Sequence, residues 1–195
     1  MFSVKVDKLT AMTDNEHNCY IVTARTVLEK CHDVYRTIAA VGDGTMAFKM
    51  AAVLQEKGKK VLFADADISE EIFLSKYRLG KNLKGITDYF LDDEMPENLI
   101  CMTNREGLDI IFTGAVEDFE SEDIDRTKFE TLKNQYLNDY DYIIVQSGDC
   151  TEIAAMCDAA VLMLNRSDYS EMSAEVKVDS LDEQGCYVLG VIVSE

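Results

Sequence analysis

The hydrophobic positions of the chain fall into short continuous runs separated by longer segments with helical spacing. Runs of about four to eight apolar residues, bounded by glycine, asparagine or aspartate, are typical of strands buried on both faces of a sheet. Six runs, including the last one, have this pattern and are interpreted as buried strands. They cover residues 34–41, 60–64, 108–112, 140–146, 159–164 and 187–193. Residues 2–6 alternate between apolar and polar side chains, which predicts one more short strand at an edge.

The segments between these runs carry apolar residues every three or four positions, as on one face of a helix. Helices are predicted at residues 16–30, 45–57, 124–137, 152–157 and 167–184, with a short helix or turn at 68–79. Thr13 or Asp14 is the candidate cap of the first helix. The side chains expected on its buried side are Tyr20, Val22, Ala24, Val27 and Leu28. This alternation predicts an α/β fold of three layers, with a mostly parallel, twisted sheet and helices on both faces.

Residues 35–67 form the centre of the pattern: a buried strand, a glycine turn, a helix and a second buried strand. The first strand must stop at Gly42, and Gly58 supplies the C-terminal stop of the helix. The second strand ends in Asp65 and Asp67. Because a β-α-β unit carries its functional loops at the carboxyl ends of its strands, we expect the functional residues there.

The composition fits one domain over residues 1–195, with an N-terminal extension and helix at 1–33 and a core at 34–195. The chain is 47% apolar and 29% charged and has a single proline, which argues against disorder. It has no apolar run long enough to span a bilayer, and its N-terminus lacks the pattern of a signal peptide. Six cysteines without framework spacing indicate a reducing cytosol. Two histidines offer little material for a zinc site, so no metal ligands are predicted.

The net charge of −18 excludes more functions than any other bulk property. A protein that binds DNA without sequence preference needs a basic stripe to neutralise phosphates. We therefore expect no nucleic-acid partner. The chain also ends in an apolar strand pattern with no basic amphipathic helix after it, so direct insertion into a membrane is not expected.

The turn in the central unit resembles the loop of the deviant-Walker P-loop ATPases, a class that includes bacterial tyrosine kinases of capsule synthesis. Their loop reads G-G-V-G-K-[ST]-T-x-A-x-N-L-A, and residues 39–51 read AAVGDGTMAFKMA without a gap. The resemblance implies a P-loop NTPase-like fold. The positions that match the loop are Val41, Gly42, Asp43, Gly44, Thr45 and Met46.

Two of these positions depart from the family's chemistry. Asp43 stands where the family has the lysine that reaches the terminal phosphates, and Gly44 stands where it has the hydroxyl that holds magnesium. Thr45 matches the second hydroxyl position. Asp65 and Asp67 match the acidic residues after the next strand.

Other segments carry the resemblance further, over about residues 35–193. The text at 140–146, YDYIIVQ, resembles the Walker B strand, with Gln146 in place of its final aspartate. A neutral amide does not supply the charge that holds hydrated magnesium. The segment 85–91, GITDYFL, resembles a helix of the capsule kinases. Arg166 is a weak match to an arginine that these kinases place near the nucleotide base.

Asp43 also has a physical interpretation that needs no ligand. A P-loop offers the unpaired N–H groups and positive dipole end of its helix to phosphate. A carboxylate at that point accepts the same N–H groups as an internal cap and repels an incoming triphosphate. We therefore interpret Gly42-Asp43-Gly44 as a capped strand-to-helix turn rather than as a working phosphate site.

These losses suggest a catalytically inactive scaffold or regulator of a capsule or exopolysaccharide assembly system. One alternative is a residual nucleotide-binding, kinase-like enzyme that uses Asp65, Asp67 and Thr45. Another is a Walker-degenerate localisation factor of pilus assembly. No cofactor is expected unless the degenerate site still binds ATP and magnesium.

The partners expected for such a protein are other proteins, either a membrane-anchored envelope-assembly protein or an active paralogue. We expect a cytoplasmic protein that reaches the inner face of the membrane only through a partner. The E-x-x-R signature with which these kinases assemble rings is not present in the first predicted helix, which leaves the oligomeric state open.

Overall fold

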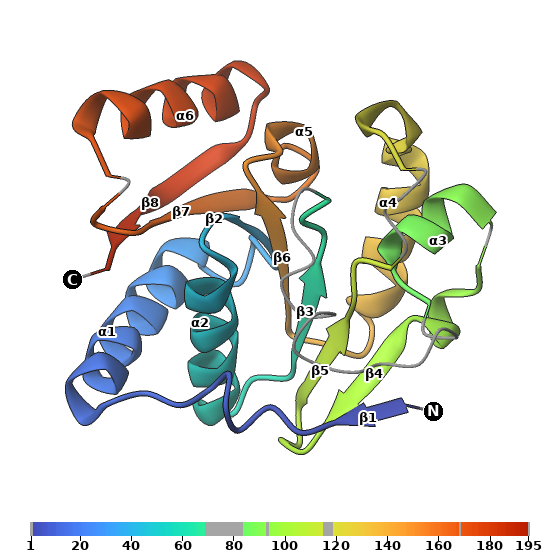
Figure 1. The fold of residues 1–195 in the computed structure, drawn as a ribbon, viewed down its shortest axis with the longest axis horizontal. Coiled ribbons are helices and arrows are strands. Elements are labelled where there is room, and N and C mark those ends of the chain that lie inside the picture. Colours follow the sequence, from blue (N-terminus) through green and yellow to red (C-terminus); the bar gives the residue numbers. More distant parts are fainter. Residues whose placement is uncertain (1, 69–83, 93, 115–118, 168, 195) are drawn as a thin grey trace.

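The protein is built around a single eight-stranded sheet with the strand order β1-β4-β5-β3-β6-β2-β7-β8 (Figure 1). The structure is a computed structural model that describes residues 2–68, 84–92, 94–114, 119–167 and 169–194. The strands are β1 (Phe2–Val4), β2 (Thr37–Gly42), β3 (Val61–Asp65), β4 (Ile100–Thr103), β5 (Leu108–Ile111), β6 (Tyr142–Gly148), β7 (Ala159–Leu164) and β8 (Tyr187–Val193). β1 and β8 lie at opposite edges, so the two ends of the chain lie on opposite sides of the molecule (Figure 1).

Every strand pair is parallel except β4 and β5, which form an antiparallel hairpin. The sequence pattern did not reveal β4. Residues 99–102 read LICM, an apolar run as short as the shortest expected for a strand, and of the four residues of β4 only Cys101 is buried. The hairpin inserts β4 between β5 and the N-terminal strand β1, which pairs with β4 through Phe2 and Cys101. The predicted edge strand at residues 2–6 is thus present over a shorter span.

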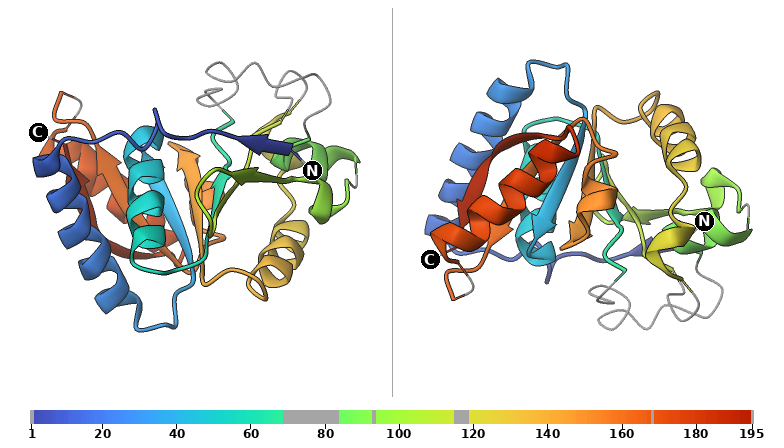
Figure 2. Two further views of the ribbon diagram at one scale, coloured as in Figure 1. Left: turned by 90° about the horizontal axis from the view of Figure 1, so that it is seen from below. Right: turned by 90° about the horizontal axis from the view of Figure 1, so that it is seen from above.

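Helices cover both faces of the sheet (Figure 2). They are α1 (Asp14–Cys31), α2 (Gly44–Glu56), α3 (Ile86–Asp92), α4 (Arg126–Tyr136), α5 (Thr151–Ala154) and α6 (Glu171–Glu183), with short 3₁₀ turns η1 (Pro96–Asn98) and η2 (Ser121–Asp123). One apolar core lies between the sheet and the pair α1 and α2, and a second lies on the opposite face beneath α3 to α6. The predicted three-layer α/β architecture is confirmed.

The first helix begins with a capping box, in which Thr13 and Glu16 each accept a hydrogen bond from the other's backbone N–H. Of its predicted inner positions, Tyr20, Ala24 and Val27 are buried, and Leu28 packs against the core. The prediction for Val22 was wrong, because its side chain is 53% exposed. Its side chain lines a groove beside β8.

The last strand, β8, is an edge strand and not the buried strand that its apolar sequence suggested. It pairs with β7 on one side, and the described part of the chain supplies no strand on the other. Its residues Tyr187, Val191 and Val193 are exposed. An apolar run therefore marked a strand correctly but misjudged its place in the sheet.

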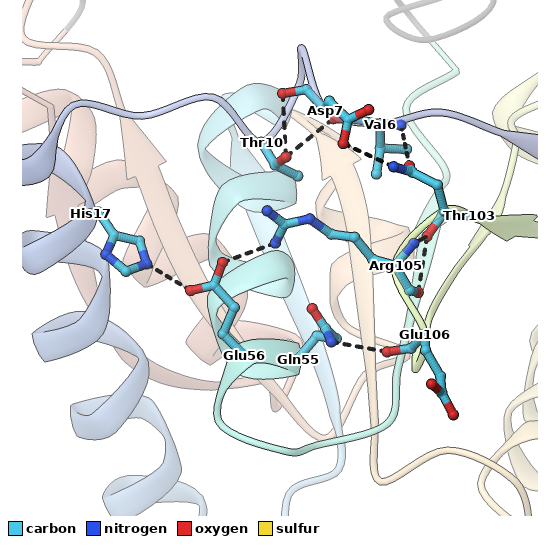
Figure 3. A network of polar contacts seen from close by, with 10 residues as sticks. Val6, Asp7, Thr10, His17, Gln55, Glu56, Thr103, Arg105 and Glu106 are labelled. Carbon is cyan, nitrogen blue, oxygen red and sulfur yellow. Dashed lines mark hydrogen bonds and ion pairs between the residues drawn. The ribbon is translucent and has the colours of Figure 1, made fainter.

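Polar contacts join α1, the end of α2 and the β4–β5 turn, which are far apart in sequence (Figure 3). Glu56, the last residue of α2, accepts hydrogen bonds from His17 of α1 at 2.6 Å and from Arg105 of the β4–β5 turn at 2.9 Å. Burial alone would raise the pKa of Glu56, but these two contacts outweigh burial and lower the pKa. Asn104 in the same turn accepts from the Val6 N–H at 2.8 Å, which holds the N-terminal segment against the hairpin.

Three further expectations concerned membrane-spanning helices, the cysteines and the segment at 68–79. Within the described ranges, no helix has the length and apolarity to cross a bilayer. All six cysteines are free thiols. The predicted short helix or turn at 68–79 lies, beyond residue 68, outside the described residues.

Candidate functional site

The carboxyl ends of three neighbouring strands bring together the positions singled out in the sequence. β3, β6 and β2 are adjacent and parallel, so Asp65, Gln146 and Gly42 end at the same edge of the sheet. Asp65 and Gln146 are direct register partners. The topology therefore assembles the constellation that the sequence resemblance implied, from residues up to 104 positions apart.

The connection from β2 to α2 consists of one residue. β2 continues through Gly42, α2 begins at Gly44, and only Asp43 lies between them. Val41 is a fully buried strand residue, while Thr45 and Met46 lie in the first turn of the helix. The positions that match a phosphate-binding loop in sequence are thus divided between a strand and a helix.

Asp43 forms the expected cap at the N-terminus of α2. Its Oδ1 accepts the backbone N–H of Met46 at 2.7 Å. Its Oδ2 accepts from the side-chain amide of Asn165, just past β7, at 2.8 Å. Asn165 is itself held by a hydrogen bond from the Ser194 hydroxyl at 3.2 Å. Both carboxylate oxygens therefore have partners within the chain.

Sequence reasoning missed Asn165 completely. It lies 122 residues from Asp43, and local patterns say nothing about such a contact. The available signal was its position, since a polar residue directly after a buried strand lies at the edge where parallel strands place functional groups. Arg166, the neighbour that the resemblance singled out instead, is exposed in the turn.

Gln146 binds the backbone rather than facing an open site. Its amide Nε2 donates to the carbonyl oxygen of Gly42 at 2.7 Å, so it holds the end of β2 in place. Its Oε1 is buried and has no hydrogen-bond partner in the described residues, and the same holds for the hydroxyl of Ser147. The register between β2 and β6 shifts at this point, because Ala40 pairs with Gln146 and Val41 with Gly148.

The two acidic residues after β3 are both buried. Asp65 is 1% exposed and Asp67 is 5% exposed. Burial raises the pKa of Asp65 to about 7, and the neighbouring carboxylate of Asp67 acts in the same direction. A hydrogen bond from the Asp67 N–H to Asp65 Oδ1, at 3.4 Å, opposes the rise. The Asp67 carboxylate packs against the backbone of Gly148, where a Cβ would lie 2.4 Å from its Oδ2.

These residues do not fit a magnesium–triphosphate in the arrangement that the resemblance implies. A phosphate-binding loop wraps several successive N–H groups around phosphate ahead of its helix, whereas Asp43 alone connects β2 to α2. The Met46 N–H is bound to a carboxylate whose charge would repel phosphate. In the described part of the chain, no cluster of three or more histidine, cysteine or acidic residues is placed to hold a metal ion.

Loss of the Asp43 carboxylate is expected to destabilise the protein by about 1 kcal/mol, as at other N-caps. Asp43→Ala and Asp43→Lys both remove the acceptor of the Met46 N–H, whereas Asp43→Asn keeps an acceptor and serves as the matched control. Urea denaturation of the four proteins, with and without Mg-ATP, measures the effect. Equal stability of the alanine variant and the parent would show that the cap contributes nothing.

The curated proteins that this chain resembles include bacterial tyrosine kinases. No family model matches the chain. Over 160 residues it is 24% identical to the tyrosine-protein kinase CpsD of Streptococcus agalactiae, covering 79% of this chain and 70% of that protein. Its homologues are bacterial tyrosine kinases of capsule and exopolysaccharide biosynthesis.

Solved structures agree on the fold. The BceF tyrosine kinase domain superposes with a TM-score of 0.81 at 18% identity, over 97% of this chain and 81% of that one. The septum site-determining protein MinD of Pyrococcus horikoshii, solved with Mg-ADP, gives a TM-score of 0.64 at 24% identity, over 81% of this chain and 69% of that one. The chain therefore has the α/β fold of P-loop NTPases and bacterial tyrosine kinase domains. This likeness at low identity establishes the fold and leaves the chemistry to be argued from the residues.

Proposed function

We propose that this protein is a catalytically inactive relative of the capsule tyrosine kinases that acts as a scaffold or regulator through protein contacts. The observation that carries the proposal is the Asp43 carboxylate at the N-terminus of α2, bound by Met46 and Asn165. In a P-loop fold the N-terminus of this helix binds phosphate. In this chain the Asp43 carboxylate lies at that N-terminus. The amide of Gln146, bonded to Gly42, supports the same conclusion because it cannot hold magnesium by charge.

The homologues indicate the setting as assembly of capsule or exopolysaccharide. A kinase-like domain that transfers no phosphoryl group acts through the contacts of its surface. Its proposed partners are therefore proteins, either a membrane-anchored component of the assembly system or an active paralogue. We place the protein in the cytoplasm, at the inner face of the membrane when a partner holds it there. The net charge of −18 supports a protein rather than a nucleic-acid partner.

We expect the purified protein neither to hydrolyse ATP nor to phosphorylate itself on tyrosine. The expected result is phosphate release at the level of a blank and no signal with an antibody against phosphotyrosine, with the Streptococcus agalactiae kinase CpsD assayed in parallel as the active control. The triple variant Asp43→Lys, Gly44→Ser, Gln146→Asp restores the family's residues and should stay inactive, because substitution does not lengthen the one-residue connection between β2 and α2.

Magnesium-dependent turnover that disappears in Asp65→Ala would overturn the proposal in favour of a residual enzyme. Activity gained by the triple variant would show that the missing side chains, and not the missing loop, explain the inactivity. If Mg-ATP strongly raises the resistance of the parent to urea and no turnover is seen, the protein is a nucleotide-binding regulator and not a scaffold without a ligand.

A further inference from the structure

The strand β8 exposes three large apolar side chains, Tyr187, Val191 and Val193. Of the eleven large hydrophobic side chains that are exposed in the described residues, six belong to residues 169–193, the segment that contains α6 and β8. A seventh, Val22, faces β8 from α1 across a groove. Exposed apolar side chains that gather in one place, rather than lying singly, mark an interaction surface.

The strand carries few of the devices that normally protect an edge. Soluble proteins guard edge strands with charged residues, proline, bulges or a covering element. The seven residues of β8, YVLGVIV, contain no charge and no proline. A register shift opposite Ala160 and Val161 is the one irregularity in its pairing with β7. One covering contact exists, in which the Lys30 ammonium of α1 donates to the carbonyl of Leu189.

Two adjoining cavities run along this edge between α1 and β8. One of about 520 Å³ lies beside Cys19, Thr23 and the end of β8, and one of about 280 Å³ lies beside Thr26 and Leu189. Thr23 and Ile192 line both, so the cavities form one continuous groove. Because α1 runs antiparallel to β8, the groove follows the strand along its length.

We propose that this groove binds an extended, cationic segment of a partner protein, which adds to the sheet as a ninth strand beside β8. The proposal rests on the function proposed above and names its contact surface. The unpaired backbone groups of an edge strand pair best with another extended backbone, and the groove provides space for alternate side chains.

Charge decides the chemistry of the occupant. α6 packs on β8 from the face of the sheet opposite α1, and its exposed acidic residues are Glu171, Glu175, Asp179, Asp182 and Glu183. The lysine of that helix, Lys177, is already paired with Asp149. Together with a net charge of −18, this surface favours lysine or arginine on the incoming segment.

A second copy of the chain fits this edge poorly. Two copies would bring together two strongly acidic surfaces. A cationic segment of another protein avoids this repulsion.

The probe is a fluorescein-labelled nine-residue peptide of alternating lysine and valine, measured by anisotropy in about 150 mM salt so that long-range charge effects are screened. Two companion peptides separate the causes: one has glutamate in place of lysine, and one has alternate backbone nitrogens methylated, which blocks strand pairing. We expect saturable binding of the first peptide and at least tenfold weaker binding of the other two. Hydrogen exchange should slow at amides of β8 when the first peptide is bound.

Val191→Lys places a charge on the free edge and should weaken binding at least tenfold. Met95→Lys makes the same change at an exposed site far from β8 and should leave binding within twofold of the parent. Equal binding of the methylated peptide, or no binding of the first, overturns the proposal. A dimer in sedimentation that Val191→Lys dissociates overturns it in favour of a second copy. None of these results bears on ATP turnover, so the peptide site and the lack of catalysis fail independently.

Discussion

Asp65→Asn is expected to stabilise the folded protein at pH 8. The pKa of Asp65 is raised to about 7 by burial, whereas in an unfolded chain a carboxyl of this kind has its ordinary value near 3.8. The unfolded state therefore loses its proton first as the pH rises, and the free energy of unfolding falls between about pH 4 and pH 7. A shift of this size corresponds to at most about 4 kcal/mol, which asparagine removes while keeping an oxygen for the Asp67 N–H.

The measurement is urea denaturation of parent and variant at several pH values from 4 to 8. The two proteins should have similar stability near pH 4 and diverge as the pH rises. Asp88→Asn is the matched control, because the Asp88 carboxylate is also buried but accepts from the Gly85 N–H and pairs with Lys84. That variant should lose stability. Parallel pH profiles of the unfolding free energy for the parent and Asp65→Asn would show that the burial of Asp65 does not destabilise the folded protein.

Gly42→Ala is expected to be the most damaging small substitution at the site. Gly42 has φ of +109°, a conformation that a side chain disfavours, and a Cβ there would lie 2.2 Å from the carbonyl oxygen of Met163. Backbone strain and forced displacement each cost about 1–3 kcal/mol, so we expect a loss of about 3 kcal/mol or more, up to loss of a cooperative unfolding transition.

Two other glycines separate these causes. Gly58 has φ of +80° and no atom within 4 Å of an added Cβ, so Gly58→Ala measures the conformational cost alone. Gly190 has neither a positive φ nor a close neighbour, so Gly190→Ala should be close to neutral. If the unfolding free energies of Gly42→Ala and Gly58→Ala agree within about 0.5 kcal/mol, the close approach of β2 and β7 does not limit this position.

The sequence predicted the central strands well because their residues are buried on both faces, which leaves a continuous apolar run such as that of β3. It failed at the edges. β4 has only a four-residue apolar run, LICM at residues 99–102, which was not assigned as a strand, while β8 has an apolar run although it is exposed. An apolar pattern reports strand formation but not the number of neighbours that a strand has.

At the candidate site, the local chemistry was predictable and the long-range contacts were not. An aspartate between a strand and a helix predicts a cap, and Asp43 forms one. The match of residues 39–51 to a phosphate-binding loop gave no sign that β2 would continue through Gly42, because aligned letters carry no backbone conformation. The contacts from Asn165 to Asp43 and from Gln146 to Gly42 depend on strand order, which sequence patterns do not specify.

The order of the strands also fixes how the chain can be assembled during synthesis. β2 pairs only with β6 and β7, so nothing in the first two-thirds of the chain gives it a partner. The N-terminal strand β1 likewise waits for β4. A ribosome must therefore release the chain beyond Gly148 before the centre of the sheet can close, and pairing over such separations is slow. Until then the apolar residues of β2 and α2 lack their partners, so we expect an N-terminal fragment that ends before β6 not to fold alone.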